Sequence, residues 1–130
     1  MLAMHPEVQE KLYQEIIDEI ADTAAVGFKQ LEHLSYLNMV IEETLRLMPP
    51  IPIIGRETLE SCRLTDKINL PRDFPVIISI FHLHRRLDLW GPDAESFNPD
   101  HFLPENIEKR HPYAYIPFSK GVRNCIGKIT

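Results

Sequence analysis

Apolar residues recur every four positions near the start of the chain, and this spacing predicts an amphipathic helix over residues 6–20. Pro6 suits the first turn of that helix, where its missing N–H costs nothing. The face expected to pack against the rest of the protein carries four aliphatic side chains: Val8, Leu12, Ile16 and Ile20. Residues 21–29 follow as a predicted linker.

A second helix is predicted from Ser35, a suitable N-cap, to about Met48, where two prolines stop it. The apolar side chains on this helix also lie at helical spacing. The stripe predicted to face the core consists of Leu37, Ile41, Leu45 and Met48.

Beyond Pro50 the pattern changes to short apolar runs that are typical of strands. Residues 52–58 are predicted to be extended, and residues 68–70 and 76–80 flank a turn that predicts a hairpin. Residues 85–117 show little periodicity and many Pro, Asp and Asn residues, which indicates coil with one short helix before Trp90. The expected fold class is α+β, mainly helical with small β elements.

Composition narrows the function classes. The chain has 130 residues and a net charge of −5, which fits a single domain and argues against a nucleic-acid-binding surface. No apolar run reaches the roughly 18 residues of a membrane span, and the first residues lack the features of a secretory signal. The two cysteines, Cys62 and Cys125, lie far apart, which favours reduced thiols over a disulfide framework.

Residues 118–127, Phe-Ser-Lys-Gly-Val-Arg-Asn-Cys-Ile-Gly and hereafter the cysteine loop, combine residue types suited to holding a haem iron by a thiolate. A thiolate ligand needs a cysteine, a close approach of the backbone to the macrocycle needs glycine, and the haem carboxylates need a cation. Candidates for these roles and for the apolar cover of the sulfur are Cys125, Gly121, Gly127, Arg123 and Phe118. The alternatives are a structural cysteine in a glycine-containing turn and a zinc site, which is weaker because no second cysteine or histidine lies at ligand spacing.

The pattern Phe-x-x-Gly-x-Arg-x-Cys-x-Gly resembles the haem-binding signature of the cytochrome P450 family of haem-thiolate monooxygenases, and all five fixed positions match. The resemblance implies a haem cofactor with Cys125 as its axial ligand. It also implies that Arg123 and Arg56 bind the haem propionates.

Two further segments carry the resemblance. Glu43 and Arg46 look like the family's Glu-x-x-Arg pair, which is buried and structural, whereas helical spacing alone indicates an exposed i,i+3 ion pair. Residues 98–102 resemble the segment that completes this network, but His101 stands where the family usually has arginine. Because histidine is shorter and partly charged near neutral pH, the resemblance predicts a weaker link here.

The resemblance covers nearly the whole chain, which looks like the C-terminal portion of a P450 haem domain (residues 1–130, an incomplete single domain). The segment 110–118 is most similar to the animal branch that includes fatty-acid hydroxylases and insect detoxification enzymes. The expected fold therefore lacks the family's distal helix and most of its final proximal helix. No catalytic residue is expected within this segment, and the isolated chain is expected to be inactive and at best partly folded.

At the family level the resemblance implies a monooxygenase that oxidises an apolar small molecule with O₂ and electrons from an NADPH-dependent reductase. An intact member of this kind is expected on the cytosolic face of the endoplasmic reticulum membrane, although this chain carries no anchor or signal. The alternatives are a non-catalytic truncated fragment or remnant and a small haem-binding protein. His82 and His84 could also be interpreted as a metal pair, for which no third ligand is in view.

Overall fold

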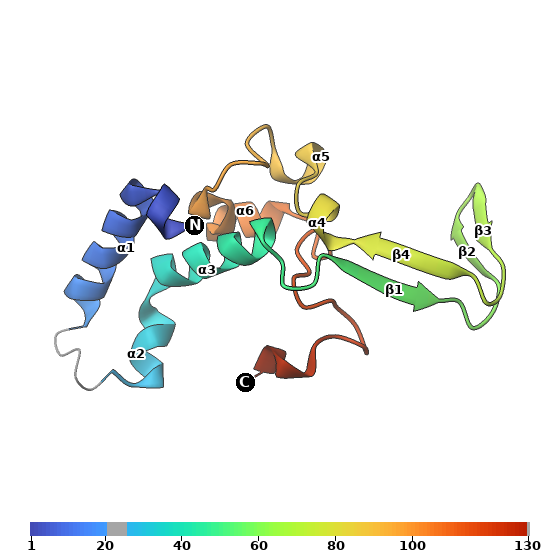
Figure 1. Cartoon of the computed structure of the whole chain (residues 1–130), viewed down its shortest axis with the longest axis horizontal. Coiled ribbons are helices and arrows are strands. Elements are labelled where there is room, and N and C mark those ends of the chain that lie inside the picture. Colours follow the sequence, from blue (N-terminus) through green and yellow to red (C-terminus); the bar gives the residue numbers. More distant parts are fainter. Residues whose placement is uncertain (21–25, 130) are drawn as a thin grey trace.

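The computed structural model describes residues 1–20 and 26–129, and it combines helices with two small sheets, which confirms the α+β class (Figure 1). The helical elements are η1 (Leu2–Met4), α1 (Pro6–Glu19), α2 (Phe28–His33), α3 (Ser35–Leu47), α4 (Ile80–Leu83), α5 (Leu87–Trp90), η3 (Pro99–Phe102), α6 (Pro104–Lys109) and η4 (Ile126–Ile129). The strands are β1 (Ile53–Glu57), β2 (Cys62–Thr65), β3 (Ile68–Leu70) and β4 (Pro75–Ser79).

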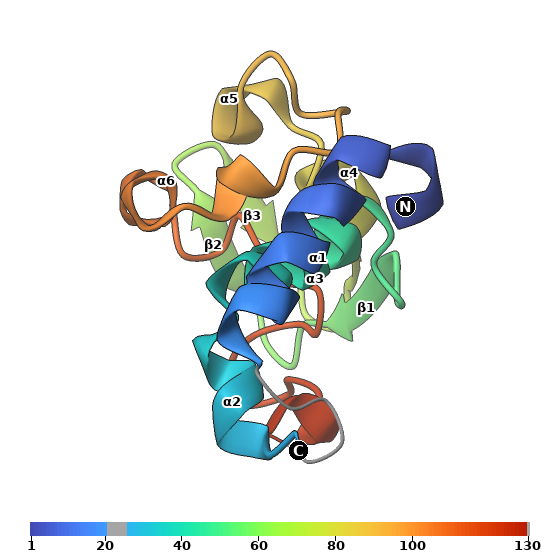
Figure 2. The same cartoon turned by 90° about the vertical axis from the view of Figure 1, so that its left-hand side faces the viewer.

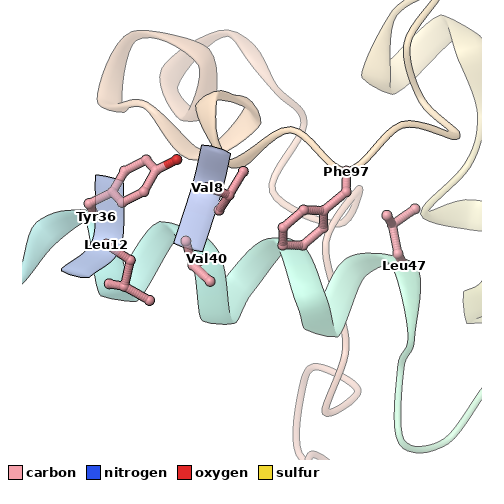
Figure 3. Close-up of a cluster of buried hydrophobic side chains, with 6 residues drawn as sticks. All are labelled: Val8, Leu12, Tyr36, Val40, Leu47 and Phe97. Carbon is pink, nitrogen blue, oxygen red and sulfur yellow. The ribbon is translucent and has the colours of Figure 1, made fainter. Parts of the chain in front are cut away.

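Helix α1 crosses α3 and packs on it through an apolar cluster (Figures 2 and 3). The stripe predicted for α1 is confirmed, since three of its residues are buried and Ile16 packs against the cluster. The cluster is formed by six buried side chains, Val8, Leu12, Tyr36, Val40, Leu47 and Phe97.

The N-terminus of α3 is capped from α1 and not by its own first residue. Leu34 is the N-cap and makes no side-chain capping bond, so the prediction of Ser35 as N-cap is wrong. The Glu15 carboxylate instead accepts from the N–H groups of Tyr36 (2.7 Å) and Leu37 (2.9 Å). A carboxylate at this end of a helix accepts from N–H groups that have no partner within the helix, and its charge interacts favourably with the positive end of the helix dipole. Glu15 therefore fixes where α3 starts relative to α1.

The apolar stripe predicted for α3 is wrong at Ile41 and Met48, whereas Leu37 packs against the cluster. Ile41 is 47% exposed and Met48 is 62% exposed, while Leu37 and Leu45 are half-buried. The fully buried face instead carries Tyr36, Val40, Glu43, Arg46 and Leu47. Helical spacing assigned charged side chains to solvent, whereas here two opposite charges are buried together.

Between α1 and α3 the predicted linker is partly helical. Residues 21–25 lie outside the described residues, but α2 begins at Phe28, inside the segment expected to be coil. Its first turn is closed by Gln30, whose Oε1 accepts from the Gly27 N–H at 2.9 Å. The Gln30 N–H in turn donates to the Gly27 carbonyl at 3.0 Å, and this pair of bonds supports a helix too short to show apolar periodicity.

The strands pair differently from the predicted hairpin. β1 pairs with β4 in an antiparallel register that joins Ile53 to Ser79 and Glu57 to Pro75, and β2 pairs with β3. The β1–β4 ribbon projects away from the helices and carries the β2–β3 hairpin at its far end (Figure 1). The prediction failed because β2 was not recognised, so β3 was assigned to the next apolar run along the chain.

The segment 85–117 is less irregular than predicted. The short helix before Trp90 is confirmed as α5, but η3 and α6 were not expected, nor was the turn of α4 that follows β4. A second apolar cluster of Trp90, Ala94 and Phe102 holds this segment together. Among the described helices, none is long and apolar enough to span a bilayer.

Candidate functional site

Glu43 and Arg46 lie one turn apart on α3 and have no exposed surface. Arg46 Nε donates to Glu43 Oε2 at 2.6 Å, and Arg46 Nη2 donates to Glu43 Oε1 at 2.7 Å. This bidentate geometry is the strongest form of an Arg–carboxylate pair. The exposed ion pair suggested by helical spacing alone is therefore wrong for these two residues.

The remaining Arg46 donors connect α3 to the chain that follows α4. Nη1 donates to the carbonyls of His84 (2.7 Å) and Ala94, and Nη2 donates to the carbonyl of Ser96 at 2.9 Å. With the two bonds to Glu43, all five guanidinium N–H groups are satisfied. Arg46 thus holds this segment on α3.

Glu43 extends the network to η3. Its Oε1 accepts from the Asn98 N–H at 2.8 Å and lies 3.1 Å from His101 Nδ1. On the other side of the imidazole, Nε2 lies 3.3 Å from Asp93 Oδ1 without the geometry of a hydrogen bond. His101 thus lies between two carboxylates and links α3 to η3. It is the residue that stands in place of the arginine expected from the sequence resemblance.

Glu43 and His101 each shift the pKa of the other. Burial alone raises the pKa of Glu43, but the hydrogen bonds from Arg46, His101 and the Asn98 N–H outweigh it and lower the pKa. Burial alone lowers the pKa of His101, but the hydrogen bond to Glu43 and the Glu43 charge outweigh it and raise the pKa. The pair therefore favours imidazolium and carboxylate together.

We expect this link to weaken as pH rises. A histidine whose pKa is raised by folding contributes its full stability below the unfolded value, about 6.5, and loses it as pH rises through the folded value. The free energy of unfolding should therefore fall as pH is increased above about 6.5, and this part of the fall should be absent in His101→Gln. Urea unfolding at a series of pH values measures it.

The exposed His111 provides the control for this pH dependence. His111→Gln should retain the wild-type fall, because this side chain contacts neither Glu43 nor Asp93. An identical pH profile for wild type and His101→Gln would show that the link does not depend on imidazolium.

The cysteine loop is shaped by turns. Cys125 N–H donates to the Phe118 carbonyl at 2.9 Å, which closes the loop, and Asn124 N–H donates to the Gly121 carbonyl at 3.1 Å. Gly121 has a φ of 89°, and the position of a Cβ there is open space. Glycine is needed at this point for its backbone conformation and leaves one surface of the loop without a side chain.

The structure brings Arg56 to the cysteine loop, although the two are far apart in sequence. Arg56 Nη2 donates to Ser119 Oγ at 3.0 Å, from the half-buried side of β1. Cys125 is a free, exposed cysteine, and Arg123 is exposed beside it in the loop. Gly127 lies within η4. A thiol and two guanidinium groups are thus carried by one loop and the strand that contacts it.

Phe118 lines an apolar cavity of about 550 Å³ beside the loop. The cavity lies between α3, represented by Leu45, and the segment from α6 to the loop. Aromatic side chains from η3 and from the segment that leads into the loop line it: Phe102, Tyr115 and Phe118. The start of the cysteine loop is therefore next to apolar surface, which suits the predicted cover of the sulfur.

Sequence reasoning missed two side chains that hold this region together. His84, considered as one of a metal pair, is fully buried, and both of its ring nitrogens are engaged with backbone groups. Among the described residues no group of three or more potential ligands is suited to a metal ion. Tyr115 donates from its hydroxyl to the Glu42 carbonyl of α3 at 3.1 Å. Neither role has a signal in the sequence, because the partners are backbone atoms.

Comparison with known proteins shows which family the chain resembles and which proteins are similar to it. The family model described as Cytochrome P450 matches residues 1–129. Among curated proteins of Drosophila melanogaster, the chain is 46% identical over 129 residues to "Probable cytochrome P450 313a4" and 50% identical over 129 residues to "Probable cytochrome P450 313a2". It is 43% identical over 128 residues to "Cytochrome P450 4p1" of the same organism.

These matches cover 98% of this chain, but 26% of each of the first two relatives and 25% of the third. The chain thus spans about a quarter of the length of the curated relatives it matches.

Proposed function

The chain belongs to the cytochrome P450 family, and we propose that residues 1–130 form the C-terminal portion of a haem domain whose cysteine loop holds the haem. In this proposal Cys125 is the axial thiolate ligand of the iron. The observation that carries it is the loop itself, which bears an exposed free thiol, is closed by the Cys125–Phe118 hydrogen bond and contains Gly121 with a positive φ.

The residues around the thiol fit such a group. Gly121 leaves room for a planar macrocycle to approach the backbone, and we assign the same role to Gly127. Arg123 and Arg56 supply cations for the two carboxylates, and the contact of Arg56 with Ser119 supports a position at the loop. In this proposal Phe118 would keep water from one side of the sulfur, which would help to preserve a thiolate.

We assign to Glu43, Arg46 and His101 a structural role, since their hydrogen bonds hold the segment 84–101 on α3. When bound, a thiolate-ligated haem supplies O₂ activation, because the thiolate donates electron density that favours O–O cleavage. The proposed reaction is insertion of one oxygen atom into an apolar small molecule. In this proposal the electrons come from an NADPH-dependent reductase. The protein is located at the cytosolic face of the endoplasmic reticulum membrane.

The test is haem uptake by the longest natural form of the protein that contains these residues. The protein is expressed with haem, reduced and exposed to carbon monoxide. We expect the strongly red-shifted absorption band that marks thiolate ligation. Failure to take up haem, or an unshifted band of the kind given by a histidine ligand, would overturn the proposal. Turnover of an apolar substrate with a reductase then separates an enzyme from a haem-binding protein without catalysis.

A further inference from the structure

His84 is a buried histidine that the proposed haem site does not use. It follows α4, has no exposed surface and lies against the rings of Tyr115 (5.3 Å between centroids) and Trp90 (6.3 Å). Its Nδ1 lies 3.1 Å from the Arg46 carbonyl of α3, and its Nε2 accepts from the Ile116 N–H at 3.0 Å. One imidazole therefore connects α3 to the segment that enters the cysteine loop.

The two partners determine the tautomer. A backbone carbonyl can only accept, so Nδ1 must carry the proton that is donated to Arg46. A backbone N–H can only donate, so Nε2 must be unprotonated to accept from Ile116. Burial of the ring, together with the charges of Arg46 and Arg85, lowers the pKa of His84 to about 4, although the hydrogen bond to the Arg46 carbonyl acts in the opposite direction. The ring is accordingly neutral over the ordinary pH range.

Ile116 lies two residues before the cysteine loop. Its carbonyl accepts from the Ser119 N–H at 3.0 Å, and two residues later the Phe118 carbonyl accepts from the Cys125 N–H. Ile116 is itself buried. Two successive backbone hydrogen bonds thus link the position of Ile116 to that of Cys125.

We propose that His84 is a positioning residue for the cysteine loop, because its neutral imidazole holds the Ile116 N–H at a fixed distance from the Arg46 carbonyl. Arg46 reinforces this by donating to the His84 carbonyl at 2.7 Å, so side chain and backbone of each residue contact the other. Tyr115 provides a second connection to α3, because its hydroxyl donates to the Glu42 carbonyl. The consequence for Cys125 as a ligand rests on the proposed haem site.

Two substitutions separate the two hydrogen bonds. The amide of His84→Gln reaches the position of Nε2 and can still accept from Ile116, whereas the amide of His84→Asn reaches the position of Nδ1 and can still donate to Arg46. A residue that only fills space would be affected similarly by both. Because the Tyr115–Glu42 bond remains, the Asn variant is expected to keep its fold.

Amide hydrogen exchange in the longest natural form of the protein, without added haem, is the first measurement. Exchange at Ile116 should be about tenfold faster in His84→Asn, which corresponds to the loss of one hydrogen bond, and close to wild type in His84→Gln. Exchange within α1 should be unchanged in both and serves as the control for folding. Equal exchange at Ile116 in the two variants would overturn the proposal.

The carbon monoxide spectrum of the haem-loaded protein is the second measurement. His84→Asn should show a smaller fraction of the red-shifted band than wild type, and His84→Gln, which keeps the bond to Ile116, should show a larger fraction than His84→Asn; equal fractions in the two variants would contradict a positioning role. If the wild type itself takes up no haem, the proposed function fails, while the exchange comparison still decides the role of His84.

A third measurement needs no variant. In wild-type protein labelled with ¹⁵N on histidine, nitrogen chemical shifts should show His84 protonated at Nδ1 and unprotonated at Nε2. A proton on Nε2 would exclude acceptance from Ile116 and overturn the proposal even if neither variant folds.

Discussion

Cys125→Ala is expected to abolish the red-shifted band of the carbon monoxide complex completely, while the free energy of unfolding changes by less than about 0.5 kcal/mol. The thiol is exposed, and the structural contribution of this residue is its N–H, which donates to Phe118 and is retained by alanine. Function and stability are therefore separable at this position. Absorption spectra and urea unfolding of the same preparations measure both.

Cys62→Ala is the matched control, because it removes the other exposed free cysteine of the chain, on β2. It should leave both the band and the stability unchanged. A band that survives Cys125→Ala would show that another group ligates the iron, and loss of the band in Cys62→Ala alone would assign the ligand to the hairpin.

Helix α1 was predicted well because the side chains on its buried face are apolar, as periodicity assumes. The buried face of α3 was misplaced because periodicity treats charges as exposed, and the groups that compensate Arg46 are carbonyls of residues 84, 94 and 96. A local pattern contains no information about such distant backbone partners. For the same reason Glu15 could not be recognised as the cap of α3.

The β pairing shows a related limit. β1 and β4 were both located, with β4 ending one residue earlier than predicted, but their pairing depends on residues brought together across an inserted hairpin. The turn of that hairpin, Asp66-Lys67, lacks the Asn-Gly or Asp-Gly signal that marks a tight hairpin in sequence. Strand existence was therefore more predictable than strand partnership.

The candidate site divides in the same way. Residues of the cysteine loop could be selected from sequence because thiolate ligation requires particular residue types at close spacing. The residues that hold the loop, His84 and Tyr115, could not, since each acts on a backbone group of another element. The candidate ligand residues could therefore be identified from the sequence, whereas the residues that position them could not.

The largest loss of stability is expected from Arg46→Met. The substitution removes the bidentate cation from the buried Glu43 carboxylate, which keeps only His101 and the Asn98 N–H, and it removes the donors to three backbone carbonyls. Breaking a buried ion pair from one side costs about 3–5 kcal/mol, which is a large share of the roughly 5–15 kcal/mol that stabilises a typical domain. The urea-unfolding midpoint of the longest natural form of the protein measures this loss.

The pair Arg63–Asp66 offers a control with the same spacing in the opposite environment. Its Nη2 and Oδ1 atoms are 2.6 Å apart at i,i+3, as close as Arg46 Nε and Glu43 Oε2, but both side chains are mostly exposed. Arg63→Met should therefore change stability little, because solvent replaces the lost partner. If Arg46→Met were equally mild, burial and the carbonyl contacts would not be the source of its contribution. Adding Glu43→Gln to Arg46→Met should recover part of the loss, since the buried charge is then removed.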